Sequence, residues 1–147
     1  MKSTWIFALA LAAVGCMGDG SLGVGDEDVG NVRRVAIGEE FTMTVHEVVV
    51  VDDTHVLISF DAVTEDSRCP TDVQCPWEGN AAVRLELSSQ IAEFAPQPRT
   101  LNTSLEPQST DFMGLTIRLV DVAPYPSTAG QPIDPESYVV KLVVTRS

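Results

Sequence analysis

Apolar and polar residues alternate with a period of two over most of the chain from Glu39 onward. Alternation at every second residue is typical of β-strands that bury one face and expose the other. No segment shows helical spacing over ten residues, which argues against a helical fold. The residues expected to face inward are Phe41, Met43 and Val45; Val56, Ile58, Phe60 and Ala62; Ala81, Val83, Leu85 and Leu87; Leu115, Ile117 and Leu119; and Tyr138, Val140, Leu142 and Val144.

Turn-forming residues separate these segments. The pair Asp52-Asp53 predicts a tight turn after the apolar run at residues 48–51. A bulge or break is expected just before that run, where Glu47 would otherwise face inward. A weaker strand is expected over residues 99–105, and most of the nine prolines lie between strands. Six to eight strands predict an all-β fold, an antiparallel β-sandwich of immunoglobulin-like size, with a β-barrel as the alternative.

The N-terminal segment has the three parts of a secretory signal peptide. Lys2 is the only charged residue before Asp19, and an apolar run follows it at residues 5–14. This run is too short to span a bilayer as a helix, which takes roughly 20 residues. Its end, Ala13-Val14-Gly15-Cys16, resembles the lipobox of bacterial lipoproteins, in which a peptidase cuts before a cysteine that carries diacylglycerol.

The lipobox resemblance implies that residues 1–15 are a lipoprotein signal peptide and that Cys16 is lipidated. The alternative is an ordinary secretory cleavage, because Ala13 and Gly15 also fit the small-residue rule for that peptidase. The residue after the lipidated cysteine is Met17 rather than the aspartate that usually retains lipoproteins at the inner membrane. The expected location is therefore the cell envelope, at the outer membrane where the cell has one.

The number of cysteines agrees with that interpretation. An exported protein with three cysteines has one thiol left over after pairing. If Cys16 is a thioether, Cys69 and Cys75 remain free to form one short-range disulfide in an oxidising compartment.

The formal net charge of −12 argues against two classes of partner. Loss of residues 1–15 removes only Lys2 and moves the charge from −12 to −13. Nucleic acid and anionic lipid headgroups are recognised by clustered Lys and Arg, and no such cluster occurs beyond Arg33-Arg34. Contact with a membrane is therefore expected through the lipid anchor only.

Residues 16–37 are rich in glycine and acidic residues and carry no periodic pattern. They are expected to be a flexible tether, so that the folded β-domain covers residues 38–147. The acidic run at residues 26–28 invites a calcium interpretation, but Gly30 stands where an EF-hand loop needs an oxygen ligand.

The most distinctive motif is D-S-R-C-P-x4-C-x-W-x-G-x-A, which runs from Asp66 to Ala81. It resembles a segment that recurs in small exported bacterial proteins of uncharacterised function, which are similar over most of the domain. The resemblance implies an architecture and an export address, and it implies no reaction.

Taken residue by residue, the motif is mainly structural. A bond between Cys69 and Cys75 would close a seven-residue loop and contribute about 2 kcal/mol. The spacing does not match the two-residue gap of redox motifs, and zinc would need two further ligands. Trp77 is expected to pack on the disulfide or on the edge of the core, and Gly79 to serve a bulge or a close strand approach. Asp66 and Arg68 are expected to bond each other or the loop backbone.

A functional interpretation of the same loop is that the disulfide pre-organises it for a partner, which lowers the ordering cost of binding. The candidate interaction residues are Arg68, Pro70, Thr71, Asp72, Val73, Gln74 and Trp77.

The sequence argues against an enzyme, and no cofactor or metal is expected. The two histidines, His46 and His55, would lie about 13 Å apart if Asp52-Asp53 is the turn between their strands. No G-x-S-x-G motif is present. A carboxylate-dependent hydrolase stays open because there are 21 acidic residues.

Three functions therefore remain. The leading one is a lipid-anchored envelope module that binds an envelope protein or polymer or serves a structural role. The second is a periplasmic inhibitor of a cationic lytic enzyme such as lysozyme, which the acidic charge favours. The third is the carboxylate-dependent hydrolase.

Overall fold

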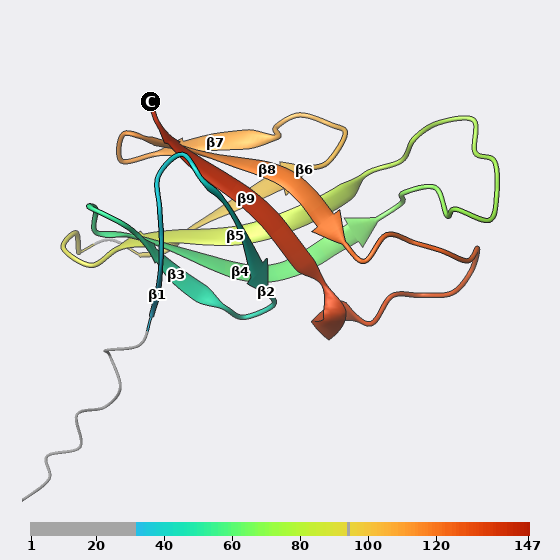
Figure 1. The fold of residues 1–147 in the computed structure, drawn as a ribbon, viewed down its shortest axis with the longest axis horizontal. Helices are drawn as coiled ribbons and strands as arrows, with labels where there is room; N and C mark the ends of the chain where they lie inside the picture. The colour runs from blue at the N-terminus through green and yellow to red at the C-terminus, as the bar shows by residue number, and fades with distance from the viewer. Residues whose placement is uncertain (1–31, 94) are drawn as a thin grey trace, which may run out of the picture.

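The computed structural model describes residues 32–93 and 95–147. These residues form two β-sheets packed face to face, so the predicted β-sandwich is confirmed (Figure 1). All strand pairs are antiparallel except β1 with β3. One sheet has the order β1 (Arg33–Val35), β3 (Val48–Val51), β4 (Val56–Asp66), β5 (Ala81–Ser89) and β6 (Gln97–Asn102). The other has the order β2 (Glu40–Thr44), β9 (Val139–Arg146), β8 (Leu115–Ala123) and β7 (Ser109–Phe112).

The core lies between the sheets and consists of the residues that the alternation predicts. All the expected inward-facing side chains of β5, β8 and β9 are buried, together with Tyr138 just before β9. Phe41, Val45 and Ala62 are only partly buried. Ala62 follows a register shift in the pairing of β4 with β5, which turns the strand out of its expected parity.

Three features of the fold differ from the sequence prediction. The described residues form nine strands rather than six to eight. The additional strands, β1 and β7, have three and four residues and are too short to show an alternation. The folded domain also begins earlier than predicted, because β1 lies within the range assigned to the tether, where it pairs with β3. The weak strand, β6, covers Gln97–Asn102 instead of residues 99–105.

The expected break before Val48 is the point where the chain changes sheets. β2 pairs with β9 in one sheet, and β3 pairs with β4 in the other. Between them His46 adopts a positive φ of 65°, and its backbone N–H donates to the Phe60 carbonyl. The predicted turn at Asp52-Asp53 is also present, with Asp53 at a φ of 57°.

Three long connections lie together at one end of the sandwich, on the right of Figure 1. They join β4 to β5 (residues 67–80), β6 to β7 (residues 103–108) and β8 to β9 (residues 124–138). We call this region the loop end. β1 lies on the opposite side of the molecule, where Arg33 pairs with Val49. Through Val49 and Ile58, Arg33 is level with Leu87 of β5, six residues from Ala81 at the base of the loop end, so the two are about 20 Å apart.

Gly79 allows the two arms of the β4–β5 connection to approach closely, as the motif predicts. Its φ is +78°, and a Cβ there would overlap the Ser67 carbonyl oxygen and lie 2.7 Å from the Arg68 Cα. Gly114, in the β7–β8 turn, also has a φ of +78°, but a Cβ would meet nothing within 4 Å. The two glycines therefore share one backbone conformation and differ in the space around it.

We expect Gly79→Ala to lower the free energy of unfolding by about 2 kcal/mol or more beyond the effect of Gly114→Ala. Both variants place Cβ at a positive φ, and only the first also drives it into backbone. Urea denaturation followed by circular dichroism, without reductant, measures both. Equal losses in the two variants would contradict the close approach.

Candidate functional site

Asp66 and Arg68 form a two-pronged ion pair where β4 enters the loop end. The Arg68 Nε donates to Asp66 Oδ1 at 2.8 Å, and Nη2 donates to Oδ2 at 2.6 Å. The Arg68 backbone N–H also donates to Oδ1 at 3.2 Å. The sequence expected these residues to bond each other or the loop backbone, and both bonds are present.

The same guanidinium reaches across to the end of β8. It donates to the carbonyl oxygens of Val122 and Pro124, the latter at 2.8 Å. Its Cζ lies 5.0 Å from the centroid of the Tyr125 ring, a cation–π distance. The Arg68 side chain is only 4 % exposed. Arg68, a candidate interaction residue in the sequence, is therefore buried and holds the loops together rather than facing solvent.

Tyr138 completes this cluster by donating its hydroxyl hydrogen to Asp66 Oδ2 at 2.9 Å. Burial alone would raise the pKa of the Asp66 carboxyl, but the hydrogen bonds from Arg68 and Tyr138 and the Arg68 charge outweigh it, so the pKa is lowered. Burial and the bond to the Asp66 carboxylate raise the pKa of Tyr138 to about 12. The cluster is therefore an ionised pair with a neutral tyrosine near neutral pH.

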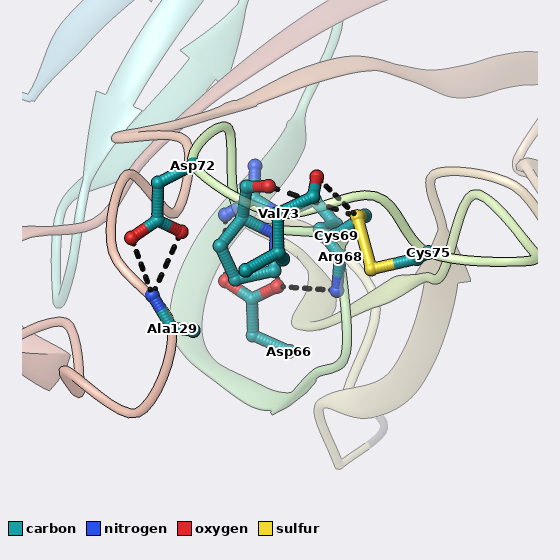
Figure 2. Close-up of a disulfide and its surroundings, with 8 residues drawn as sticks. Asp66, Arg68, Cys69, Asp72, Val73, Cys75 and Ala129 are labelled. Carbon is teal, nitrogen blue, oxygen red and sulfur yellow. Dashed lines mark hydrogen bonds and ion pairs between the residues drawn. A yellow bond between two sulfur atoms is a disulfide. The ribbon is translucent and has the colours of Figure 1, made fainter.

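The disulfide loop is fastened to the β8–β9 connection at its own tip. Cys69 and Cys75 are bonded, with their Cα atoms 5.9 Å apart, which confirms the predicted pair. Figure 2 shows the Asp72 carboxylate accepting from the Ala129 N–H, at 3.0 Å to Oδ1. The Thr71 N–H donates to the Pro126 carbonyl at 3.1 Å. Loop 67–80 is thus tied at both base and tip.

Asn80 ties the third connection, a role that the sequence analysis missed. This buried side chain accepts from the Ser104 N–H at 3.1 Å and the Leu105 N–H at 3.4 Å, and its Nδ2 donates to Asn102 Oδ1 at 2.8 Å. In the sequence, this role is marked only by an asparagine directly before the strand predicted from Ala81 onward. An amide residue at such a position is weak evidence for any role.

The remaining candidate interaction residues lie at the surface. Thr71, Asp72, Val73 and Gln74 are exposed, and Pro70 is half-buried. Trp77 is 72 % exposed, so the expectation that it packs on the disulfide or the core is wrong. The loop projects past Asp66 and Ala81, the outermost pair of β4 and β5, and residues 69–79 contribute no side chain to the core.

Exposed apolar side chains gather at the loop end. Of the eight large exposed apolar residues in the described chain, five belong to its loops or to the adjoining part of β8: Val73, Trp77, Leu105, Val120 and Tyr125. Two hollows lie among them. A groove of about 390 Å³ runs between Trp77 and Leu105. A pocket of about 200 Å³ lies beside Tyr125 and Val120, and Glu78 and Ser104 line both hollows.

The exposed charges of the three connections are all acidic. The acids outside the Asp66 cluster are Asp72, Glu78, Glu106, Asp134 and Glu136. Arg68 is the one Lys or Arg in residues 67–80, 103–108 and 124–138, and Asp66 neutralises it. The loop end is therefore an apolar surface with an acidic surround.

The two histidines do not meet. The distance expected from the sequence placed Val50 opposite His55. In the structure Val50 pairs with Leu57 instead, two residues further along the chain. His46 lies beside Phe60, five residues along β4 from His55, which places the histidines about 17 Å apart. Within residues 32–93 and 95–147, no three His, Cys, Asp or Glu side chains gather closely enough to hold a metal ion.

Among the residues that the structure describes, no helix is long and apolar enough to cross a membrane. The proposed lipidation residue, Cys16, lies outside the described residues. Comparison with models of protein families, with curated proteins and with solved structures finds no match for the chain.

We expect Arg68→Met to lower the free energy of unfolding by about 3–5 kcal/mol, because it leaves the Asp66 carboxylate and two carbonyl groups without their partner. Arg118→Met, at an exposed position on β8, should change it by less than about 0.5 kcal/mol. Denaturant unfolding at pH 7 measures both.

The Arg68→Met penalty should also depend on pH. In the native protein the lowered pKa of Asp66 contributes stability that is present above the unfolded pKa of about 4 and is lost as pH falls through the folded value. The penalty should therefore grow as pH rises from about 3 to about 6, while Arg118→Met shows no such trend. A penalty independent of pH would contradict the ion pair as the main stabilising contact of the cluster.

Proposed function

We propose that this is a lipid-anchored protein of the bacterial cell envelope whose β-sandwich binds another protein through the loop end. The anchor is inferred from the lipobox resemblance at Cys16. The disulfide supports this inference. Because Cys69 is paired with Cys75, Cys16 is left with no second cysteine of the chain to bond.

The observation that carries the binding function is the gathering of exposed apolar side chains on a clamped surface. Trp77 and Leu105 are 72 % and 60 % exposed, and contiguous exposed apolar surface commonly marks an interaction site. The disulfide, the Arg68 cluster and the Asn80 bonds fix the loops that carry them. A surface that is already ordered loses little conformational entropy on binding.

The position of the loop end also supports binding away from the membrane. β1, where the described chain enters the sandwich, lies on the opposite side of the molecule (Figure 1). A domain tethered through this strand would present the loops outward, toward partners in the envelope.

The geometry favours binding over catalysis at this cluster. A general acid or base works best with a pKa near the operating pH. The pKa of Asp66 is lowered and that of Tyr138 is raised to about 12, so neither group is suited to exchange a proton near neutrality. Both are also bonded to each other.

An inhibitor of a cationic lytic enzyme is the special case in which the bound protein is such an enzyme. The acidic surround of the loop end favours it, because opposite charge accelerates and orients association.

The anchor is tested by intact-mass analysis of the chain extracted from bacterial membranes. We expect a mass that corresponds to cleavage before Cys16 plus acyl modification, and Cys16→Ser should release the protein from the membrane fraction. Cys69→Ser with Cys75→Ser serves as the control, since it removes sulfur but should leave the anchor in place. An unmodified Cys16 thiol would refute the proposal.

The binding surface is tested by site-specific photocross-linking in intact cells. A benzophenone side chain at position 105 should give one discrete protein adduct, and Trp77→Ala in the same chain should weaken it by at least about fivefold. The same probe at Met113, which is exposed in the β7–β8 turn at the other end of β8, should give no such adduct. Equal labelling from positions 105 and 113 would overturn the assignment of the loop end.

A further inference from the structure

Two hollows of different chemistry lie side by side at the loop end. The larger, of about 390 Å³, has Trp77 and Leu105 as its exposed walls. The smaller, of about 200 Å³, has Glu78 and Asp121 among its walls together with the Tyr125 ring. Glu78 and Ser104 line both hollows, so the hollows are neighbours. Two adjacent side chains of one ligand can therefore enter one hollow each.

The larger hollow offers its occupant apolar contact and little hydrogen bonding. Two of the polar side chains that line it, Asn80 and Ser67, are already bonded within the protein. The Asn80 amide bonds the backbone of Ser104 and Leu105 and the side chain of Asn102. The Ser67 hydroxyl bonds the backbone of Asn80. What remains accessible is mainly the apolar surface of Trp77 and Leu105.

The smaller hollow is suited to a positive charge. Its two carboxylates, Glu78 and Asp121, form no ion pair with any Lys or Arg in the described part of the chain. Arg68 also lines this hollow, but its charge is matched by Asp66. The Tyr125 ring already makes a cation–π contact with Arg68, so the two carboxylates supply the attraction for an incoming cation.

We propose that the loop end recognises a basic segment of another protein in two parts. An apolar side chain of the segment lies between Trp77 and Leu105, and a neighbouring Lys or Arg side chain enters the pocket between Glu78 and Asp121. This assignment rests on the proposed binding function and names the chemistry of its partner.

Charge and hydrogen bonding disfavour the other occupants of such a groove. Anionic polymers and nucleic acid would meet the acidic side chains Asp72, Glu78 and Glu106. A neutral glycan stacks well on an exposed tryptophan, but it also needs side chains that are free to bond its hydroxyls. In the larger hollow Asn80 and Ser67 are bonded within the protein, which leaves Glu78 and Ser104 of its lining to bond them.

The fluorescence of Trp77 provides a direct measurement. Trp5 and Trp77 are the two tryptophans of the chain, so Trp5→Phe in the full-length protein leaves one indole, located in the groove. The probe is a synthetic peptide with one leucine flanked by two lysines on each side. The comparison peptides replace every lysine by glutamate, or the leucine by glycine.

We expect the lysine–leucine peptide to shift or quench the emission of Trp77 in a saturable way, and neither comparison peptide to match it. Binding should weaken at least tenfold in about 1 M NaCl, where the Debye length is about 3 Å. Glu78→Gln should weaken it about threefold to fivefold, and Leu105→Ser about tenfold. The controls Glu93→Gln and Met113→Ser, which alter exposed residues away from the loop end, should leave it unchanged.

Three results would overturn the proposal: no saturable change with the lysine–leucine peptide, an equal change with the glutamate peptide, or a change produced only by a neutral oligosaccharide such as a chitin fragment. These results are distinct from failure of the binding function itself. A protein adduct from position 105 in cells, together with a negative peptide titration, would keep a binding surface and refute a basic partner. Absence of both would remove the binding function as well.

Discussion

The loop end depends on one buried guanidinium. Arg68 bonds Asp66 at the end of β4, the carbonyl oxygen of Val122 in β8 and that of Pro124 on the β8–β9 connection. A single side chain thus joins segments more than fifty residues apart in the sequence. A planar group with five N–H donors can satisfy several acceptors at once, whereas the ammonium of a lysine has three donors at one point. The two hydrogen bonds to Asp66 fix the orientation of the guanidinium plane. The bonds from that plane to the carbonyl groups then fix the separation of the β4–β5 and β8–β9 connections.

Burial of this ion pair is costly, and the surrounding contacts offset the cost. Desolvated charges are tolerated where their remaining donors and acceptors are bonded, and Tyr138 and the two carbonyl groups supply those bonds. The consequence is a set of loops that stay ordered without covering their own apolar residues. Trp77 can remain 72 % exposed because the loop that carries it is held by bonds at its base and tip rather than by packing of its side chains. A clamped apolar surface of this kind suits the proposed binding of another protein.

The alternation of the sequence predicted the core well because burial of one strand face is a local, repeated property. It failed for β1 and β7, which are too short to repeat, and for the sheet edge that β1 occupies through a long-range pairing with β3. At the candidate site the motif predicted the Asp66–Arg68 bond and the close approach at Gly79, both set by neighbours in sequence. The exposure of Trp77 and the bonds of Asn80 depend on where other loops lie, and no local pattern encodes that position.

In the proposed arrangement, the distance between β1 and the loop end determines which molecules the acidic charge of the loop end acts on. A tethered domain with a formal charge of this sign is repelled by anionic headgroups, but at physiological ionic strength that repulsion decays over about 8 Å. The base of the loop end at Ala81 lies about 20 Å along β5 from the level of Arg33 in β1. A membrane that the tether approaches from the β1 side therefore exerts little force on Glu78 and its neighbours. Their charge acts instead on molecules that approach the loops directly, and among these it selects basic ones.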